Sequence, residues 1–204
     1  RYAYKNQPAI LVWNLAKFAE TLIPLVNEES EKSVKQLTEV LQLVMPSYEE
    51  YFYKELFKKL GLEEKSNKNI RIVKDYLSIL ESNSIDLTSS FRDLSKILVN
   101  DKKIKESVFS NIHNFDQWYE CWKQELNKNQ NLNIAQKMDS INPCYIPRNH
   151  IIEEVLMAVM NNDLSELNKF IKILENPFKE ISKYQEYASA PLNSDSNYVT
   201  YCGT

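Results

Sequence analysis

The stretch PAILVWNLAKFAETLIPL, residues 8–25, decides the fold class. Its large apolar residues recur at alternating steps of four and three: Leu11, Leu15, Phe18, Leu22 and Leu25. Because an α-helix turns once every ~3.6 residues, this spacing places them on one stripe of a helix. Pro8 suits the first turn of that helix, where its missing N–H would have no partner. The stretch therefore predicts an amphipathic helix that ends close to Pro24.

The same period continues through most of the chain, and no segment alternates strongly enough to require a β-sheet. Further helices are expected over Ser30–Val44, Tyr48–Leu60, Ile70–Leu80, Leu87–Leu98, Phe115–Leu126, Ile134–Ile141, Ile151–Met160 and Leu164–Leu174. Asp86 is a candidate N-cap and Gly61 a candidate C′ residue. Pro46 and Ser47 are expected to separate the second helix from the third. The pattern predicts an all-α fold.

Composition fits a globular protein and sets the domain prediction. The chain has 204 residues, of which 43% are hydrophobic and 26% charged, with only two glycines. Few glycines leave few places for tight hairpins or phosphate-binding loops, which favours helices joined by polar turns. We predict a single domain over residues 1–187 and an extended C-terminal tail over residues 188–204. No apolar run approaches the ~20 residues of a membrane span, so no membrane is expected as a partner.

Charge and cysteine content disfavour two further classes: nucleic-acid-binding proteins and proteins held together by disulfide bonds. The net charge of −3 disfavours nucleic acid as a partner, since such binding needs a basic surface. The lysine-rich runs Lys65–Lys74 and Lys102–Lys105 contain or adjoin acidic residues, which is typical of solvated helix faces. Cys121, Cys144 and Cys202 form no CxxC pair, so no disulfide framework is expected and a reducing compartment is the default.

Catalytic motifs are missing from the sequence. It contains no GxGxxG, GxxxxGK[ST] or GxSxG pattern. On paper, His150 and Cys144 could form a Cys–His pair, or join Cys121 and His113 in a zinc site. Neither spacing matches a common pattern, so we expect ordinary structural roles for all four residues.

The segment NPCYIPRNH, residues 142–150, concentrates two prolines, polar side chains and a cation before a predicted helix. One interpretation is structural: Asn149 caps the helix, and Arg148 forms a buried ion pair with an acid elsewhere in the chain. The other interpretation is ligand binding near the helix N-terminus. We favour the structural interpretation, because the planar guanidinium group suits such pairing.

Five segments together resemble the SelO (YdiU) family of protein adenylyltransferases. They are RYAYKNQPAILVWNLAKFAETLIPL (1–25), KKLGL (58–62), IDLTSSFRDLS (85–95), NPCYIPRNH (142–150) and YVTYCGT (198–204). They are similar to landmarks of that family and occur in the same order, from the first residue of the chain to the last. The chain is therefore expected to be the C-terminal portion of a larger protein.

The resemblance implies the helical C-terminal part of a protein-kinase-like (pseudokinase) fold. The parent protein would transfer AMP from ATP to Ser, Thr or Tyr hydroxyls of protein substrates, using Mg²⁺ or Mn²⁺. The family's catalytic, ATP-binding and metal-binding motifs lie upstream of the segments matched here. No catalytic, cofactor-binding or metal residue is therefore assigned to this chain, which is expected to be inactive and free of cofactors on its own. Its expected partners are the N-terminal catalytic half and the parent's protein substrates.

The resemblance also carries over one position. The family ends with Cys or selenocysteine third from the terminus, and Cys202 occupies that place. The resemblance implies a redox-regulatory disulfide between Cys202 and a cysteine of the upstream half, formed by thiol–disulfide exchange. By the same resemblance, the location would be the cytoplasm in a bacterium or the mitochondrion in a eukaryote.

A non-catalytic helical interaction module is the alternative function. In that case the aromatic-rich stretch Tyr48–Phe57 would form a partner-binding face. A large exposed apolar patch would instead favour a scaffold that packs against the rest of a parent protein. A helical nucleic-acid-binding domain is a third possibility, which the net charge disfavours.

Overall fold

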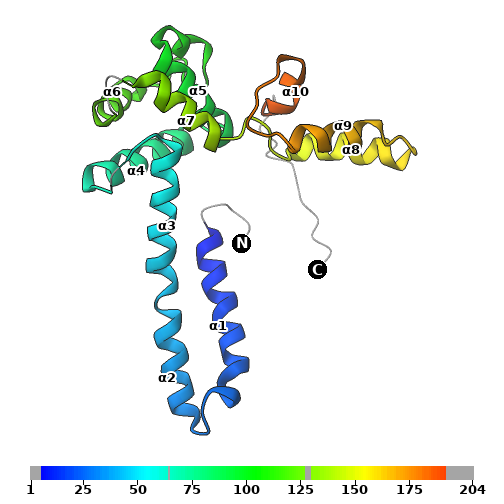
Figure 1. Cartoon of the computed structure of the whole chain (residues 1–204). Helices are drawn as coiled ribbons and strands as arrows, with labels where there is room; N and C mark the ends of the chain where they lie inside the picture. Colours follow the sequence, from blue (N-terminus) through cyan, green and yellow to red (C-terminus); the bar gives the residue numbers. More distant parts are fainter. Residues whose placement is uncertain (1–5, 64, 127–129, 192–204) are drawn as a thin grey trace. The chain divides into compact units, whose positions relative to one another are not determined.

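The computed structural model describes residues 6–63, 65–126 and 130–191. Over these ranges the regular elements are all helices and no strand is present, so the predicted all-α fold is confirmed (Figure 1). In chain order they are α1 (Gln7–Val26), α2 (Ser30–Leu41), α3 (Val44–Lys59), α4 (Asn67–Ser82), α5 (Leu87–Val99), η2 (Asp101–Glu106), α6 (Phe115–Glu125), α7 (Asn131–Ile141), α8 (Asn149–Met160), α9 (Ser165–Leu174), η3 (Ser182–Tyr184) and α10 (Gln185–Ala188).

The chain divides into two compact units, Arg1–Leu56 and Phe57–Thr204. The sequence predicted one domain over residues 1–187, which spans both units and stays a prediction. In the first unit, the buried residues among those described are Ala19, Ser33 and Leu56. Most of the expected tail, residues 192–204, lies outside the described residues.

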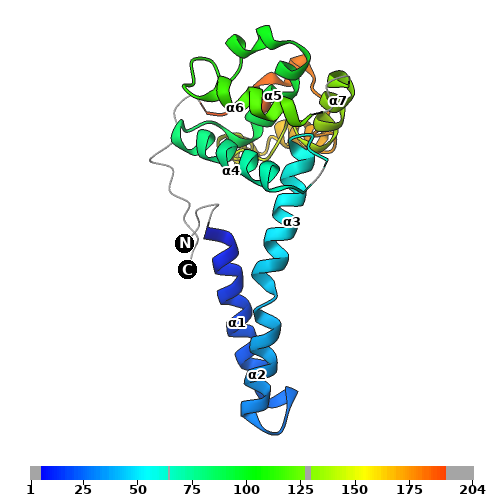
Figure 2. The same cartoon turned by 90° about the vertical axis from the view of Figure 1, so that its left-hand side faces the viewer.

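The first unit is a helical hairpin continued by most of α3. α1 runs antiparallel to α2 and packs against it (Figures 1 and 2). Pro8 lies in the first turn of α1 and Pro24 in its last, as expected from the sequence. α3 begins at Val44, so Pro46 lies in its first turn and the expected break at Pro46–Ser47 is wrong. A proline is tolerated there because first-turn N–H groups have no partner within the helix.

Among the described residues, α1 is the one helix long and apolar enough to cross a membrane by length and composition. It has 20 residues and a mean hydropathy of 1.5 over the relevant window, of which 6% is buried. This corrects the expectation that no apolar run approaches that length. Lys17 and Glu20 interrupt the run without lowering its mean hydropathy enough to exclude it. Core helices of soluble proteins and signal sequences meet the same criterion, so composition alone does not assign a membrane.

The second unit has an aromatic core between α4, α5 and α6. Trp118 and Trp122 stack with their ring centroids 5.7 Å apart, and Trp118 also stacks on Tyr76 at 4.8 Å. The indole N–H of Trp118 donates to the carbonyl of Ile72, and that of Trp122 to the carbonyl of Leu60, each at 2.9 Å. These large rings therefore bury their area while keeping their polar atoms paired, which fixes their orientation.

Gly61 ends α3 as the sequence predicted. It has a φ of +68°, and the N–H of Leu62 reaches back to the carbonyl of Phe57 at 2.8 Å, as in a Schellman motif. A Cβ at this position would lie 2.6 Å from Cγ2 of Ile134. Glycine is therefore required both by the backbone conformation and by the close approach of α7.

Candidate functional site

The segments IDLTSSFRDLS (85–95) and NPCYIPRNH (142–150) lie against each other in the second unit. Asp86 caps α5, because its Oδ1 accepts the backbone N–H of Ser89 at 2.8 Å. The same carboxylate binds Arg148 in a two-pronged pair, with Nη1–Oδ2 at 3.0 Å and Nη2–Oδ1 at 2.8 Å. Such fork-to-fork pairing fixes both distance and orientation between the start of α5 and the start of α8.

The protonation of Asp86 reflects this setting. Partial burial alone would raise its pKa, but the hydrogen bonds from Arg148 and Ser89 outweigh burial and lower the pKa from 3.8 to about 2. The side chains of Arg148 and Asp86 are 6% and 24% exposed, respectively, so solvent screens this pair only partly. The pair therefore remains ionised and intact at neutral pH.

Arg92 forms a second buried anchor, six residues or nearly two turns after Asp86. Its Nη1 donates to the carbonyl of Asp139 at 3.1 Å and to that of Asn142 at 3.4 Å, and it lies 3.0 Å from Oδ1 of Asp139. Its Nη2 pairs with Glu180 at 3.2 Å. Arg92 therefore connects α5 to the end of α7 and to the segment that follows α9.

Asn142 joins the same network through its side chain. Its Nδ2 donates to the carbonyl of Lys59 at 2.8 Å, and its Oδ1 accepts from Nζ of Lys59 at 3.2 Å. Asn142 is 1% exposed, and these two hydrogen bonds satisfy its buried amide group. We call the whole set the polar junction, which consists of Asp86, Arg92, Asn142, Arg148 and Glu180.

Cys144 and Tyr145, between Asn142 and Arg148, form hydrogen bonds to the segment that follows α9. The N–H and the thiol of Cys144 both donate to the carbonyl of Pro177, at 2.8 and 3.0 Å. The Tyr145 hydroxyl donates to the carbonyl of Ile181 at 3.1 Å and accepts the N–H of Ile181 at 2.9 Å. Burial raises the pKa of the Cys144 thiol above 9.0, so this cysteine is held as the unreactive thiol.

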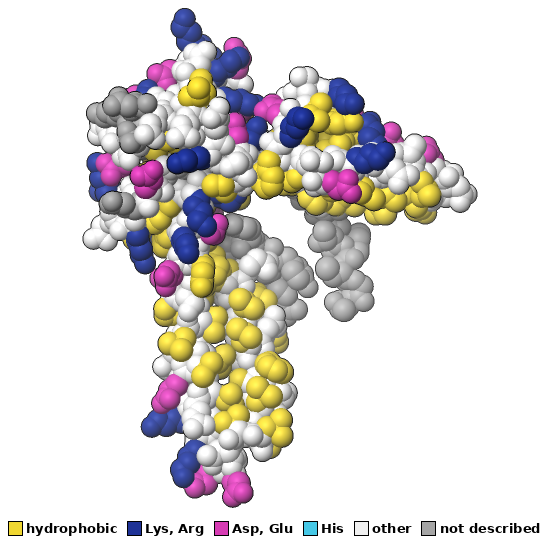
Figure 3. Space-filling view, in the orientation of Figure 1, with side chains coloured by type: hydrophobic (Ala, Val, Ile, Leu, Met, Phe, Trp, Pro, Cys, Tyr) yellow, Lys and Arg dark blue, Asp and Glu magenta, His cyan; other side chains and the backbone are white. Residues whose placement is uncertain are grey.

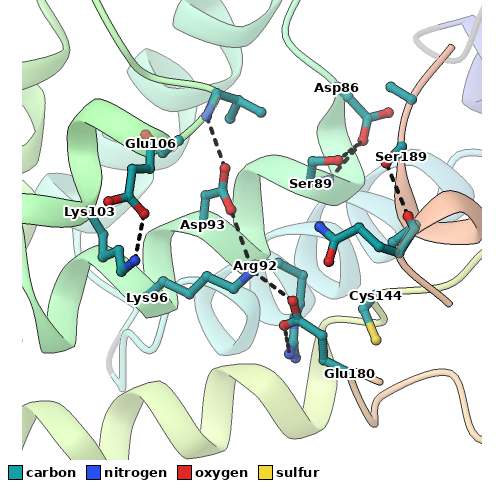
Figure 4. A pocket seen from close by; sticks show the side chains of 15 residues that line it. Asp86, Ser89, Arg92, Asp93, Lys96, Lys103, Glu106, Cys144, Glu180 and Ser189 are labelled. Carbon is teal, nitrogen blue, oxygen red and sulfur yellow. Dashed lines mark hydrogen bonds and ion pairs between the residues drawn. The ribbon is translucent and has the colours of Figure 1, made fainter. Parts of the chain in front are cut away.

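A cavity of 590 Å³ opens beside the polar junction (Figure 4). The charged side chains that line it are Asp86, Arg92, Asp93, Lys96, Lys103, Glu106 and Glu180. Most are paired with each other: Lys96 lies 3.0 Å from Glu180, and Lys103 pairs with Glu106. Asp93 accepts the N–H of Val108 at 2.9 Å, and burial raises its pKa. This arrangement holds helices together, because its charges are directed at one another.

Comparison with known proteins places the chain in a family. The family model described as "Protein adenylyltransferase SelO" matches residues 1–175. The chain belongs to this family.

Curated relatives of the family match the chain over its whole length. "Protein nucleotidyltransferase YdiU" of Pelagibacter ubique is 39% identical over 208 residues, which cover 100% of the chain and 42% of that protein. The proteins of the same name from Clostridium beijerinckii and Bacillus thuringiensis are each 34% identical, and the match covers 41% of their length. The chain therefore spans about two fifths of the length of these SelO-family relatives.

The residues singled out from the sequence have different outcomes. The buried ion pair expected for Arg148 is confirmed, with Asp86 as its partner. The expected cap by Asn149 is wrong, because Arg148 occupies the N-cap position and Asn149 is already the first residue of α8. Cys202 lies outside the described residues.

The Cys–His and zinc arrangements, which the sequence disfavoured, find no support. Cys121 is exposed, while Cys144 is buried and donates to a backbone carbonyl. No group of three or more His, Cys, Asp or Glu side chains in the described ranges is placed to hold a metal ion.

Sequence reasoning missed Arg92 and Asn142. Arg92 lies on the buried side of an amphipathic helix, where an arginine signals an internal acid partner. That signal is available from the sequence, since Arg92 falls between the apolar positions Phe91 and Leu94. The sequence does not identify the acid that pairs with Arg92, because Glu180 lies 88 residues away in a polar stretch.

Proposed function

We propose that the parent protein is an adenylyltransferase that transfers AMP from ATP to Ser, Thr or Tyr hydroxyls of proteins. This chain would be its C-terminal helical scaffold, within a protein-kinase-like (pseudokinase) fold. The observation that carries the proposal is the match of the whole chain to nucleotidyltransferases of which it spans only 41–42%. Relatives of that length have ample room for a catalytic lobe outside the matched region.

The geometry of the polar junction supports a scaffolding role. Asp86, Arg92 and Arg148 direct their charges at other groups of the second unit, where they hold α5, α7 and α8 in fixed relation. A catalytic base needs instead a reacting partner within hydrogen-bond reach. The chain's own residues therefore orient helices, and the parent's remaining residues would carry the chemistry.

Mg²⁺ or Mn²⁺ does not fit the described residues. These ions bind through several oxygen ligands, and the described carboxylates form no suitable group. We therefore propose that the metal and the ATP bind to the rest of the parent. We further propose that the partners are the catalytic half and its protein substrates, with no nucleic acid and no membrane; the net charge of −3 disfavours nucleic acid.

Regulation through Cys202 and the cellular location remain proposals that rest on the family. The thiolate of Cys202 would exchange with a mixed disulfide on a cysteine of the catalytic half, releasing the thiol that held it. The location would be the cytoplasm of a bacterium or the mitochondrion of a eukaryote.

The test is transfer of AMP from α-labelled ATP to protein, with Mg²⁺ or Mn²⁺, by this chain and by the uncut parent side by side. We expect transfer by the parent and none by the chain. Transfer by the isolated chain would refute the scaffold role, and inactivity of both proteins would refute the activity proposed for the parent.

The alternative of a non-catalytic interaction module receives less support. Its expected partner-binding face, Tyr48–Phe57, does not form one exposed surface: Tyr51 is 64% exposed, whereas Phe57 is 5% exposed. Tyr48 and Phe52 stack on each other with centroids 5.5 Å apart. The stretch is therefore divided between internal packing and solvent.

A further inference from the structure

α1 carries an apolar stripe that nothing in its own unit covers. Leu11, Phe18 and Leu25 are spaced seven residues apart, and they are 48%, 60% and 79% exposed. Because seven residues are nearly two turns, all three side chains project from one side of the helix. We call these three residues the α1 stripe.

The other sides of α1 are already accounted for. Ala19 is buried, and Leu15 and Leu22, which lie between Ala19 and the α1 stripe, are half-buried, consistent with the packing of α1 on α2. Another side carries Lys17 and Glu20, which pair at 2.7 Å. The α1 stripe is thus the exposed edge of the apolar face whose other edge packs on α2.

Further apolar side chains are exposed on α2 and in the turn that follows it. Val34, Val40 and Leu43 are 47%, 63% and 63% exposed. The space-filling view shows hydrophobic side chains gathered over α1 and α2 (Figure 3). Several large apolar side chains exposed on one helical hairpin are uncommon on a free surface and mark a site of contact with another body. A unit this size with so few buried residues also lacks the core that independent folding requires.

We propose that the α1 stripe is an intramolecular docking surface, covered by the part of the parent protein that the relatives carry outside the matched region. The inference rests on the proposed function, because the occupant is the rest of that same adenylyltransferase. The relatives are more than twice as long as the match, which spans 41–42% of them, so the covering body is large enough.

Two other occupants fit the surface less well. A bilayer would have to accept Lys17 and Glu20 in the middle of a 20-residue helix, where charged side chains are costly. A second copy of the chain would leave the parent's own remainder without a contact on a surface of this extent. The rest of the same polypeptide is therefore the occupant that fits this surface.

The test is cysteine labelling with a maleimide, read by peptide mass spectrometry, in the 204-residue chain and in the uncut parent. Phe18→Cys places a thiol on the α1 stripe, and Glu20→Cys places a matched thiol on the exposed polar side, where the Glu20 side chain is 59% exposed. We expect at least tenfold slower labelling of Phe18→Cys in the parent than in the chain. Glu20→Cys should label equally fast in both. Equal rates for Phe18→Cys would overturn the proposal.

The remaining occupants give distinct outcomes in the same assay. If the isolated chain becomes protected on adding phosphatidylglycerol vesicles while the parent stays reactive, a bilayer is the occupant and the proposal is wrong. Protection that grows with the concentration of the chain, again without protection in the parent, would identify a second copy and equally overturn it. If Phe18→Cys prevents folding, amide hydrogen exchange of α1 in the unmodified parent and chain replaces it, with slower exchange expected in the parent.

Labelling does not depend on AMP transfer, so the two proposals fail separately. A protected α1 stripe in an inactive parent would refute the proposed activity and leave the docking surface standing. A reactive α1 stripe in an active parent would refute the docking surface alone.

Discussion

Removal of Arg148 tests whether the polar junction stabilises the second unit. Arg148→Ala would leave Asp86 without its two-pronged partner in a site where the two side chains are 6% and 24% exposed. Breaking a fully buried pair typically costs about 3–5 kcal/mol, and the remaining exposure of Asp86 reduces that figure. Independently, a pKa lowered from 3.8 to about 2, at 1.36 kcal/mol per pH unit, corresponds to about 2 kcal/mol. We expect a loss of about 2–3 kcal/mol in the free energy of unfolding.

The measurement is urea unfolding at pH 7, followed by tryptophan fluorescence and far-ultraviolet circular dichroism. Arg71→Ala is the matched control, because Arg71 is 84% exposed and pairs with Asp75 at 3.6 Å on the surface of α4. An exposed pair of that kind contributes about 0–1 kcal/mol, so the control should shift the unfolding midpoint little. If Arg148→Ala shifts the midpoint no more than Arg71→Ala does, the stabilising role assigned to the polar junction is wrong.

The same pair predicts a pH dependence. The pKa of Asp86 is lower in the folded chain than in the unfolded one, so the unfolded chain binds more protons between these two pKa values. The stabilisation is therefore fully present above about pH 4 and is lost as the pH falls toward about 2. The unfolding free energy of Arg148→Ala should decline less over this range than that of the unmodified chain. Parallel declines would contradict the pairing.

Three further substitutions test other parts of the second unit by the same unfolding assay. Gly61→Ala should cost about 2 kcal/mol or more, since it adds a left-handed backbone penalty to a Cβ contact of 2.6 Å. Trp122→Phe should cost about 1–3 kcal/mol, because it leaves a buried carbonyl unpaired, whereas Trp13→Phe at an exposed site should cost little. Asp93→Asn should leave stability at pH 7 unchanged or slightly higher, because burial penalises the ionised carboxylate, whereas Asp93→Ala should lower it by removing the acceptor of the Val108 N–H.

The helices and several of their ends could be predicted from the sequence, since these follow from local spacing. α5 is an example, because Asp86 and the apolar period after it define its start without any tertiary information. The start of α3 could not be placed in this way. A proline marks a boundary only to within one helical turn, and Pro46 proved to lie inside the first turn of α3.

Contacts between residues distant in sequence could not be predicted from local sequence patterns. Arg148 could be expected to find an acid, but the choice of Asp86 depends on how α5 and α8 pack together. Asn149 was misplaced by one position, because the extended backbone of Arg148, with a φ of −79° and a ψ of +137°, makes Arg148 the last residue before α8.

The polar junction has a consequence for synthesis of the protein on the ribosome. Its contacts join residues far apart in the chain: Lys59 with Asn142, and Arg92 with Glu180, at separations of 83 and 88 residues. At a translation rate of roughly 5–20 residues per second, Arg92 emerges roughly 4–18 s before Glu180. During that interval Arg92 has no acid from the C-terminal segment, and the aromatic core must assemble around an incomplete set of charges. Synonymous codons that speed elongation over this region are therefore expected to lower the yield of folded protein.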